Sequence, residues 1–119
     1  MSDYRIGQSA TKCRRFSEAD VARYRELTSD RIDVGIVPAP LIGGMFSDLL
    51  GTELPGRGTN WMKQSFRFVA DAHVGVDLVA SVEIVRLRPE KDLVNLRTIC
   101  IDAYGRLICD GEALVMHVG

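Results

Sequence analysis

The chain has 119 residues, of which 46% are hydrophobic and 26% charged, and its formal net charge is −1. These values are ordinary for a globular protein, so we expect a single domain over residues 1–119. The near-neutral charge gives no electrostatic reason to expect nucleic acid or a membrane surface as a partner. No apolar run is long enough to span a bilayer, and the first residues lack the apolar core of a secretory signal.

The three cysteines are widely spaced, odd in number and without a Cys-x-x-Cys pair. This usage indicates free thiols in a reducing compartment, and we expect a cytoplasmic protein. Cys100 and Cys109 fall in alternating apolar segments. We therefore expect both side chains to fill a buried face of a sheet.

The first elements are a short extended segment over residues 11–16 and a helix that follows it. Ser17 can cap this helix, Asp20 can return a hydrogen bond to the cap, and Phe16 precedes the cap as a hydrophobic staple would. The helix is expected to end near Ser29. One apolar stripe indicates a helix lying on a surface, and it comprises Val21, Tyr24 and Leu27.

The most informative stretch runs from Ile36 to Gly51 and reads Ile-Val-Pro-Ala-Pro-Leu-Ile-Gly-Gly-Met-Phe-Ser-Asp-Leu-Leu-Gly. Pro40 suits a first helical position, where its missing N–H is harmless. Apolar residues then lie on every side of the predicted helix, which indicates burial. Gly43 and Gly44 cost roughly 1 kcal/mol each relative to alanine inside a helix. We therefore expect a sheet or a ligand to approach the helix closely there.

The second half alternates apolar and polar residues in four segments, which predicts strands at 61–68, 78–84, 93–102 and 107–118. In the first of them, Trp61 is expected on the face opposite Phe66 and Phe68. The predicted order is strand, surface helix, buried helix and four strands. This α+β order favours a single hot-dog domain, in which an antiparallel sheet wraps around a buried central helix.

Four blocks carry a resemblance to a known family: Leu49–Thr59, Lys63–Phe68, Val82–Lys91 and Asp110–Ala113. In this order and spacing, the chain resembles the MaoC-like (R)-specific enoyl-CoA hydratases and hydroxyacyl-thioester dehydratases over nearly its whole length. The resemblance implies a lyase that interconverts trans-2-enoyl and (R)-3-hydroxyacyl thioesters in fatty acid metabolism. The substrate would be carried by CoA or an acyl-carrier protein, with no cofactor and no metal.

The catalytic motif of that family is incomplete in this chain. The family loop reads Gly-Asp-x-Asn-Pro-x-His, and Ile-Val-His-Gly-Met leads into the buried helix after an overhanging segment. Asp30 matches the catalytic aspartate, but neither Asn-Pro nor the histidine follows, and the overhanging segment is absent. Residues 38–40, Pro-Ala-Pro, stand where His-Gly-Met would be. The chain's two histidines, His73 and His117, match neither position.

Two carboxylates are the catalytic candidates that remain, Asp30 and Asp33. Neighbouring carboxylates can divide acid and base roles when their pKa values separate, although loop aspartates are more often only solvated. Amides at the start of the buried helix are candidate donors to a thioester oxygen. The substrate-binding candidates are Pro40, Leu41, Gly43 and Gly44 on this helix, Arg57 for carrier phosphates, and Trp61 as a channel wall. Arg57 and Trp61 could equally be a solvated charge and ordinary packing.

Three functions therefore remain open at this point. The leading hypothesis is a divergent hydratase or dehydratase. The alternatives are a non-catalytic thioester-binding or partner subunit, and an acyl-thioester hydrolase. In each case we expect a homodimer or higher homo-oligomer, because long apolar strands at a sheet edge need a partner.

Overall fold

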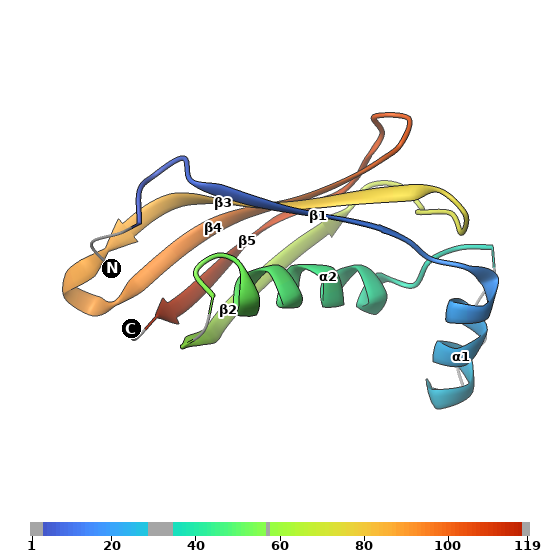
Figure 1. Ribbon diagram of the computed structural model, residues 1–119, viewed down its shortest axis with the longest axis horizontal. Coiled ribbons are helices and arrows are strands. Elements are labelled where there is room, and N and C mark those ends of the chain that lie inside the picture. The colour runs from blue at the N-terminus through green and yellow to red at the C-terminus, as the bar shows by residue number, and fades with distance from the viewer. Residues whose placement is uncertain (1–3, 29–34, 57, 118–119) are drawn as a thin grey trace.

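The computed structural model of the protein describes residues 4–28, 35–56 and 58–117. A five-stranded antiparallel sheet in the order β1-β3-β4-β5-β2 curves around the long helix α2 (Figure 1). The elements are β1 (Ser9–Arg15), α1 (Glu18–Thr28), α2 (Ala39–Thr52), β2 (Thr59–Phe68), β3 (Asp77–Arg88), a short 3-10 helix (Pro89–Lys91), β4 (Leu93–Asp102) and β5 (Leu107–His117). This is the hot-dog arrangement predicted from the sequence. None of the helices in the described ranges is long and apolar enough to cross a membrane.

The predicted start of the first helix is confirmed. The Ser17 backbone N–H donates to Asp20 Oδ2 over 2.9 Å, and the Asp20 N–H donates to Ser17 Oγ over 3.1 Å. The hydrogen bond from the Ser17 backbone N–H to the carboxylate, followed by one from the Ser17 side chain, holds the pKa of Asp20 below its usual range. Phe16 and Val21 are buried on either side of the cap. Helix α1 is thereby fixed at one end of the sheet (Figure 1).

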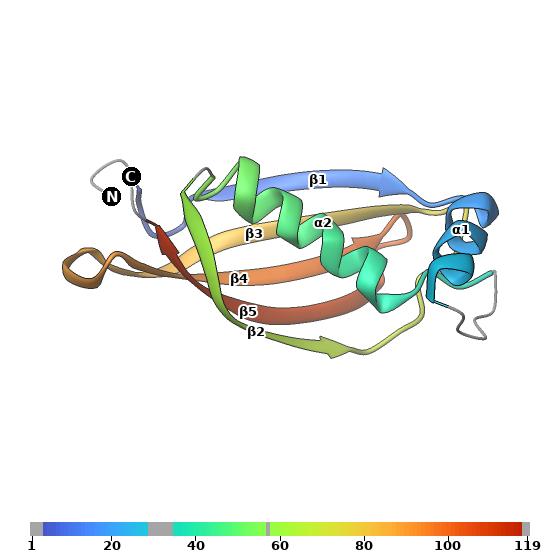
Figure 2. The same ribbon diagram turned by 90° about the horizontal axis from the view of Figure 1, so that it is seen from below.

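Helix α2 is buried on one side only, which corrects the expectation of a helix enclosed all round. Its buried side chains lie against the sheet and are Ile42, Met45, Phe46, Leu49 and Leu50. Gly44, Ser47 and Asp48 are exposed. The sheet covers one face of the helix, and β1, the edge strand, only reaches its flank, where Lys12 pairs with Asp48. Figure 2 shows the uncovered side of α2 facing the viewer.

The expected close approach at the helix glycines is wrong within this chain. A Cβ atom at Gly43 or Gly44 would meet nothing within 4 Å. The tight contact lies instead at Gly111 of β5, where a Cβ would come within 1.8 Å of the Ser65 carbonyl oxygen. Strand β2 can therefore lie against β5 only because position 111 has no side chain.

A bulge in β2 corrects the predicted face of Trp61. The register with β5 pairs Trp61 with Val115 but Lys63 with Leu114, so Met62 is an extra residue. Directly paired residues project on the same face of a sheet. Because Val115 is buried beneath α2, Trp61 lies on the same face as Phe66 and Phe68, not on the face opposite to them.

The last two strands, β4 and β5, form a hairpin around residues 103–106. The Asp102 carboxylate accepts hydrogen bonds of 2.9 Å from the Tyr104 N–H, the Arg106 N–H and Arg106 Nε. Burial alone would raise the pKa of Asp102, but the hydrogen bonds from Arg106 and Tyr104 outweigh it and lower the pKa. Cys100 and Cys109 lie opposite each other in this hairpin, both fully buried as free thiols, as expected.

Candidate active site at the start of helix α2

The N-terminus of α2 presents a single free amide. Pro38 is its N-cap in extended geometry (φ −61°, ψ 143°), with no side-chain cap and no acidic residue in the first turn. The Val37 N–H donates to the Ala72 carbonyl over 2.8 Å, and the Leu41 N–H donates to the Pro38 carbonyl over 3.0 Å. Pro38 and Pro40 have no N–H. The N–H of exposed Ala39 thus has no recorded partner within the described ranges.

This arrangement can stabilise negative charge at one point. The partial positive charge of a helix N-terminus and its unsatisfied N–H groups attract anions. In an oxyanion hole, such a donor stabilises the oxygen of a thioester as charge develops on it. The sequence predicted several amide donors at the start of this helix. In the structure, only the Ala39 N–H of this turn is available to donate to a thioester oxygen.

A short two-stranded ladder fixes the entry to α2. The Val37 N–H reaches the Ala72 carbonyl, and the Val74 N–H donates to the Gly35 carbonyl over 3.1 Å. Between these bonds, Ile36 and His73 form an antiparallel bridge. His73, which the sequence places only in a turn between strands, therefore lies beside the chain that enters the helix. The signal for this pairing is non-local, so no sequence motif reveals it.

The other histidine lies elsewhere. His117 is buried at the end of β5, where it pairs with the first residue of β2. Its ring packs edge to face against the Tyr4 ring, with 5.2 Å between the centroids. Among the residues that the structure describes, no three His, Cys, Asp or Glu side chains are grouped to hold a metal ion.

The sequence-predicted site residues separate into three groups. Asp30, Asp33 and Arg57 lie outside the described residues. Pro40, Leu41, Gly43 and Gly44 come together in the first two turns of α2. Trp61 does not join them, because β2 begins beside the C-terminal end of α2 and runs back toward its N-terminus (Figure 2).

An apolar row follows β2 on the face that carries α2. The Phe66 ring lies 5.3 Å from the Phe46 ring of α2 and 5.9 Å from the Phe68 ring, measured between centroids. Trp61 and Phe68 remain 41% and 42% exposed, because α2 does not reach over this edge. Gln64 is the polar member of the row, and its buried amide oxygen has no hydrogen-bond partner in the described part of the chain. The sequence analysis did not single out Gln64.

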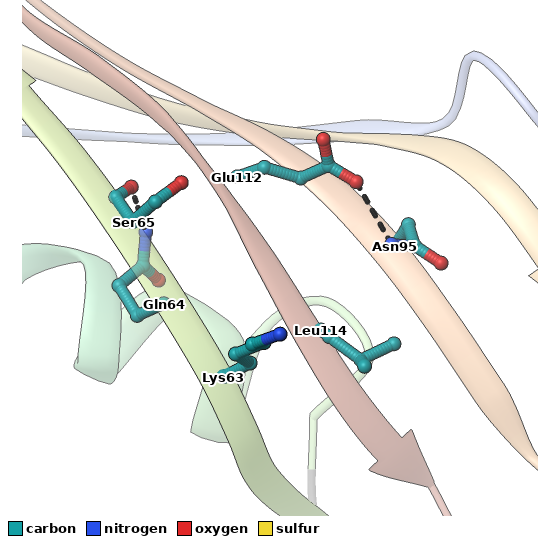
Figure 3. A pocket seen from close by; sticks show the side chains of 6 residues that line it. All are labelled: Lys63, Gln64, Ser65, Asn95, Glu112 and Leu114. Carbon is teal, nitrogen blue, oxygen red and sulfur yellow. Dashed lines mark hydrogen bonds between the residues drawn. The ribbon is translucent and has the colours of Figure 1, made fainter.

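A hollow of about 360 Å³ at the start of β2 is lined by Trp61, Met62, Lys63 and Gln64, and two further hollows accompany these elements. The larger, of about 410 Å³, lies on the outer face of the sheet, away from α2 (Figure 3). It is lined by Lys63, Gln64, Ser65, Asn95, Glu112 and Leu114, with Asn95 donating to Glu112 over 2.8 Å. It contains none of the predicted site residues. The smaller, of about 200 Å³, adjoins the start of α2 and is lined by Arg14, Phe16, Asp20, Arg23, Tyr24 and Leu41.

The five-stranded antiparallel sheet wrapped around one face of α2 defines the class of protein as a hot-dog domain. The comparisons with known proteins then identify the family. The chain is 35% identical to an (R)-specific enoyl-CoA hydratase of Aeromonas caviae, over 92% of each chain. It is 34% identical to an (R)-specific enoyl-CoA hydratase of Rhodospirillum rubrum, over 96% of this chain and 88% of the relative.

A solved structure agrees with these sequence relationships. The (R)-hydratase from A. caviae superimposes with a TM-score of 0.92 at 31% identity, covering 99% of this chain and all of the other. No protein-family model matches the chain. The chain belongs to the (R)-specific enoyl-CoA hydratase family.

The alignments also show a difference in length between this chain and a relative. The alignment with the Aeromonas relative spans 124 positions, yet it takes in only 92% of this 119-residue chain. That relative therefore has residues within the aligned span for which this chain has no counterpart.

Proposed function

We propose that the protein is an enoyl-thioester hydratase, which adds water reversibly to a trans-2-enoyl thioester and gives the (R)-3-hydroxyacyl thioester. The observation that carries the proposal is its membership, over nearly its full length, of the (R)-specific hydratase family. The free Ala39 amide at the start of α2 supports it, because hydration passes through a thioester enolate whose oxygen needs a donor.

In the proposed reaction, the thioester oxygen accepts the Ala39 N–H while water attacks C3. The partly exposed apolar row beside β2 offers an apolar path for the acyl chain. Asp30, with Asp33 as its neighbour, is the carboxylate that the sequence assigns to proton transfer. The reaction needs no cofactor besides the carrier of the acyl group. The three free cysteines support a cytoplasmic location.

The test is a set of assays on the purified protein with crotonyl-CoA. Loss of absorbance of the conjugated double bond, with (R)-3-hydroxybutyryl-CoA as product, is the expected result. Release of free CoA would identify a hydrolase instead. Binding of the thioester without any turnover would identify a non-catalytic subunit. A parallel assay with crotonyl-acyl-carrier protein distinguishes the carrier, because one relative is named as a 3-hydroxyacyl-[acyl-carrier-protein] dehydratase.

We also propose that the protein is a homodimer joined along β2. Both β1 and β2 are edges of the sheet, but β1 carries Lys12, Arg14 and Arg15, which disfavour pairing with another strand. Edge strand β2 instead exposes apolar side chains on itself and just beyond its end, namely Trp61, Met62, Phe68 and Val69. Light scattering at micromolar concentration should give twice the chain mass, and Met62→Lys should shift the protein toward monomer. A monomer mass for the unaltered protein contradicts the proposal.

A further inference from the structure

We propose that His73 is the general acid and base of this enzyme, taking the role for which the family loop supplies a histidine that this chain lacks. The inference rests on the proposed hydratase function. It starts from the ladder between residues 35–37 and 72–74, which ties the β2–β3 connection to the entry of α2.

The hydrogen-bond pattern of the ladder fixes how close His73 lies. The two bonds flank the Ile36–His73 pair instead of joining it, so this is a non-hydrogen-bonded antiparallel pair. In such pairs the Cα atoms are about 4.5 Å apart and the two side chains lie close together on one face. The neighbouring residues Val37 and Ala72 are buried. His73 and Ile36 therefore project from the other face, away from the core, and His73 is exposed.

The position of His73 also suits the free amide of Ala39. Three residues of extended chain, from Ile36 to Ala39, span at most about 10 Å. An imidazole on the partner of Ile36 can therefore share a site with the Ala39 N–H. The proposed site needs three contacts of about 3 Å each: from the imidazole to the water, from the water to C3, and from the thioester oxygen to the amide N–H. A separation of this size between the two protein groups leaves room for the water and the reacting end of the thioester.

The chemistry follows with atoms and charges balanced. The His73 imidazole accepts one proton of the water as the water oxygen forms its bond to C3. The C2=C3 electron pair moves toward the thioester carbonyl, whose oxygen becomes an enolate held by the Ala39 N–H. The imidazolium then gives its proton to C2 as the enolate collapses. One water has been added, and His73 is returned to its starting form.

Charged side chains near His73 within the described ranges lie on three segments. On its own segment, Asp71 lies two residues away and its carbonyl accepts a hydrogen bond from Arg106 over 3.0 Å. Beyond Gly75, whose N–H donates to the Phe16 carbonyl, lies the exposed Arg15–Asp77 ion pair. The facing residues 35–37 carry no charge. A neutral imidazole carries both a proton acceptor and a proton donor, as the two proton transfers of the proposed reaction require.

The experiment measures kcat for crotonyl-CoA hydration from pH 5 to 9. His73→Gln should lower kcat on the order of 10²-fold or more and change its pH dependence. His73→Ala should recover part of its rate when imidazole is added, whereas Asp71→Asn, two residues away, should leave rate and pH profile unchanged. Equal melting temperatures establish that the variants are folded.

Two negative results are distinguishable. If the unaltered protein hydrates crotonyl-CoA and His73→Gln does so with the same kcat and the same pH profile, the assignment of His73 is wrong and the hydratase function stands. If the unaltered protein does not hydrate the thioester, the proposed function fails, and the role of His73 fails with it.

Discussion

Replacement of Ala39 by proline removes one hydrogen-bond donor from the candidate site and little else. Proline is well tolerated at the first position of a helix, and Pro38 already has the extended geometry (ψ 143°) that a following proline requires. The Ala39 N–H bonds to no other group of the described chain, so the fold loses no hydrogen bond. Ala39→Pro should therefore melt within a few degrees of the unaltered protein.

The effect on catalysis should be much larger than the effect on stability. Loss of one oxyanion-hole donor typically lowers kcat by about 10²–10³-fold, or roughly 2.7–4 kcal/mol of transition-state stabilisation. Here Pro38 and Pro40 lack an N–H and the Leu41 N–H is already bonded, so no neighbouring amide replaces the lost donor. We expect kcat for crotonyl-CoA hydration to fall by this factor, whereas Ala39→Gly, which keeps the N–H, should retain most activity. A folded Ala39→Pro protein with kcat within twofold of the unaltered protein would refute the assignment of this amide.

Three further predictions concern stability and the sequence-derived carboxylate. Gly44→Ala should stabilise the protein by about 0.5–1 kcal/mol, because alanine favours a helix more than glycine does and the new Cβ meets no atom within 4 Å. Gly111→Ala should instead lower the melting temperature, because its Cβ would collide with a β2 carbonyl. Asp30→Asn separates the two assignments of proton transfer in the crotonyl-CoA assay: hydration should fall at least about 10²-fold if Asp30 takes part, and should be unchanged if His73 carries out both transfers. The pKa of Asp102 is lower in the folded state than in the unfolded chain, where it is about 4. The ionised carboxylate therefore stabilises the folded protein above this unfolded-state pKa, and the stabilisation is lost as pH falls through the folded-state pKa. Urea midpoints measured from pH 2 to 7 should thus fall less steeply at acidic pH in Asp102→Asn.

Much of the fold follows from local sequence signals. The capping box at Ser17 and Asp20 lies where the pattern predicts it, and β4 has the predicted limits, Leu93–Asp102. Such elements depend on side chains that are neighbours in the sequence, so periodicity and capping residues are sufficient to locate them. The hot-dog order follows from the same local elements taken in sequence.

The features that could not be predicted depend on contacts between distant segments or on single inserted residues. The bulge at Met62 reverses the face of Trp61, and a strict two-residue alternation contains no sign of it. The His73–Ile36 bridge joins segments 37 positions apart in the chain, and no local pattern encodes it. Of the two partners expected at the glycines of α2, the sheet is not in close contact with them, because sequence alone does not reveal which side of a helix the sheet covers, and approach by a ligand stays a prediction.

The bulge in β2 has a consequence for how such clefts diversify. If β2 lost the bulge and Met62 itself paired with Val115, Trp61 would move opposite Met116 and rotate out of the cleft. Lys63, Gln64 and the residues after them would keep their partners on β5. A change in pairing register, with no substitution at all, would thereby exchange the large aromatic wall at one end of the cleft for the smaller side chain of Met62. Comparison of relatives by residue type alone would miss this route to a differently shaped acyl pocket.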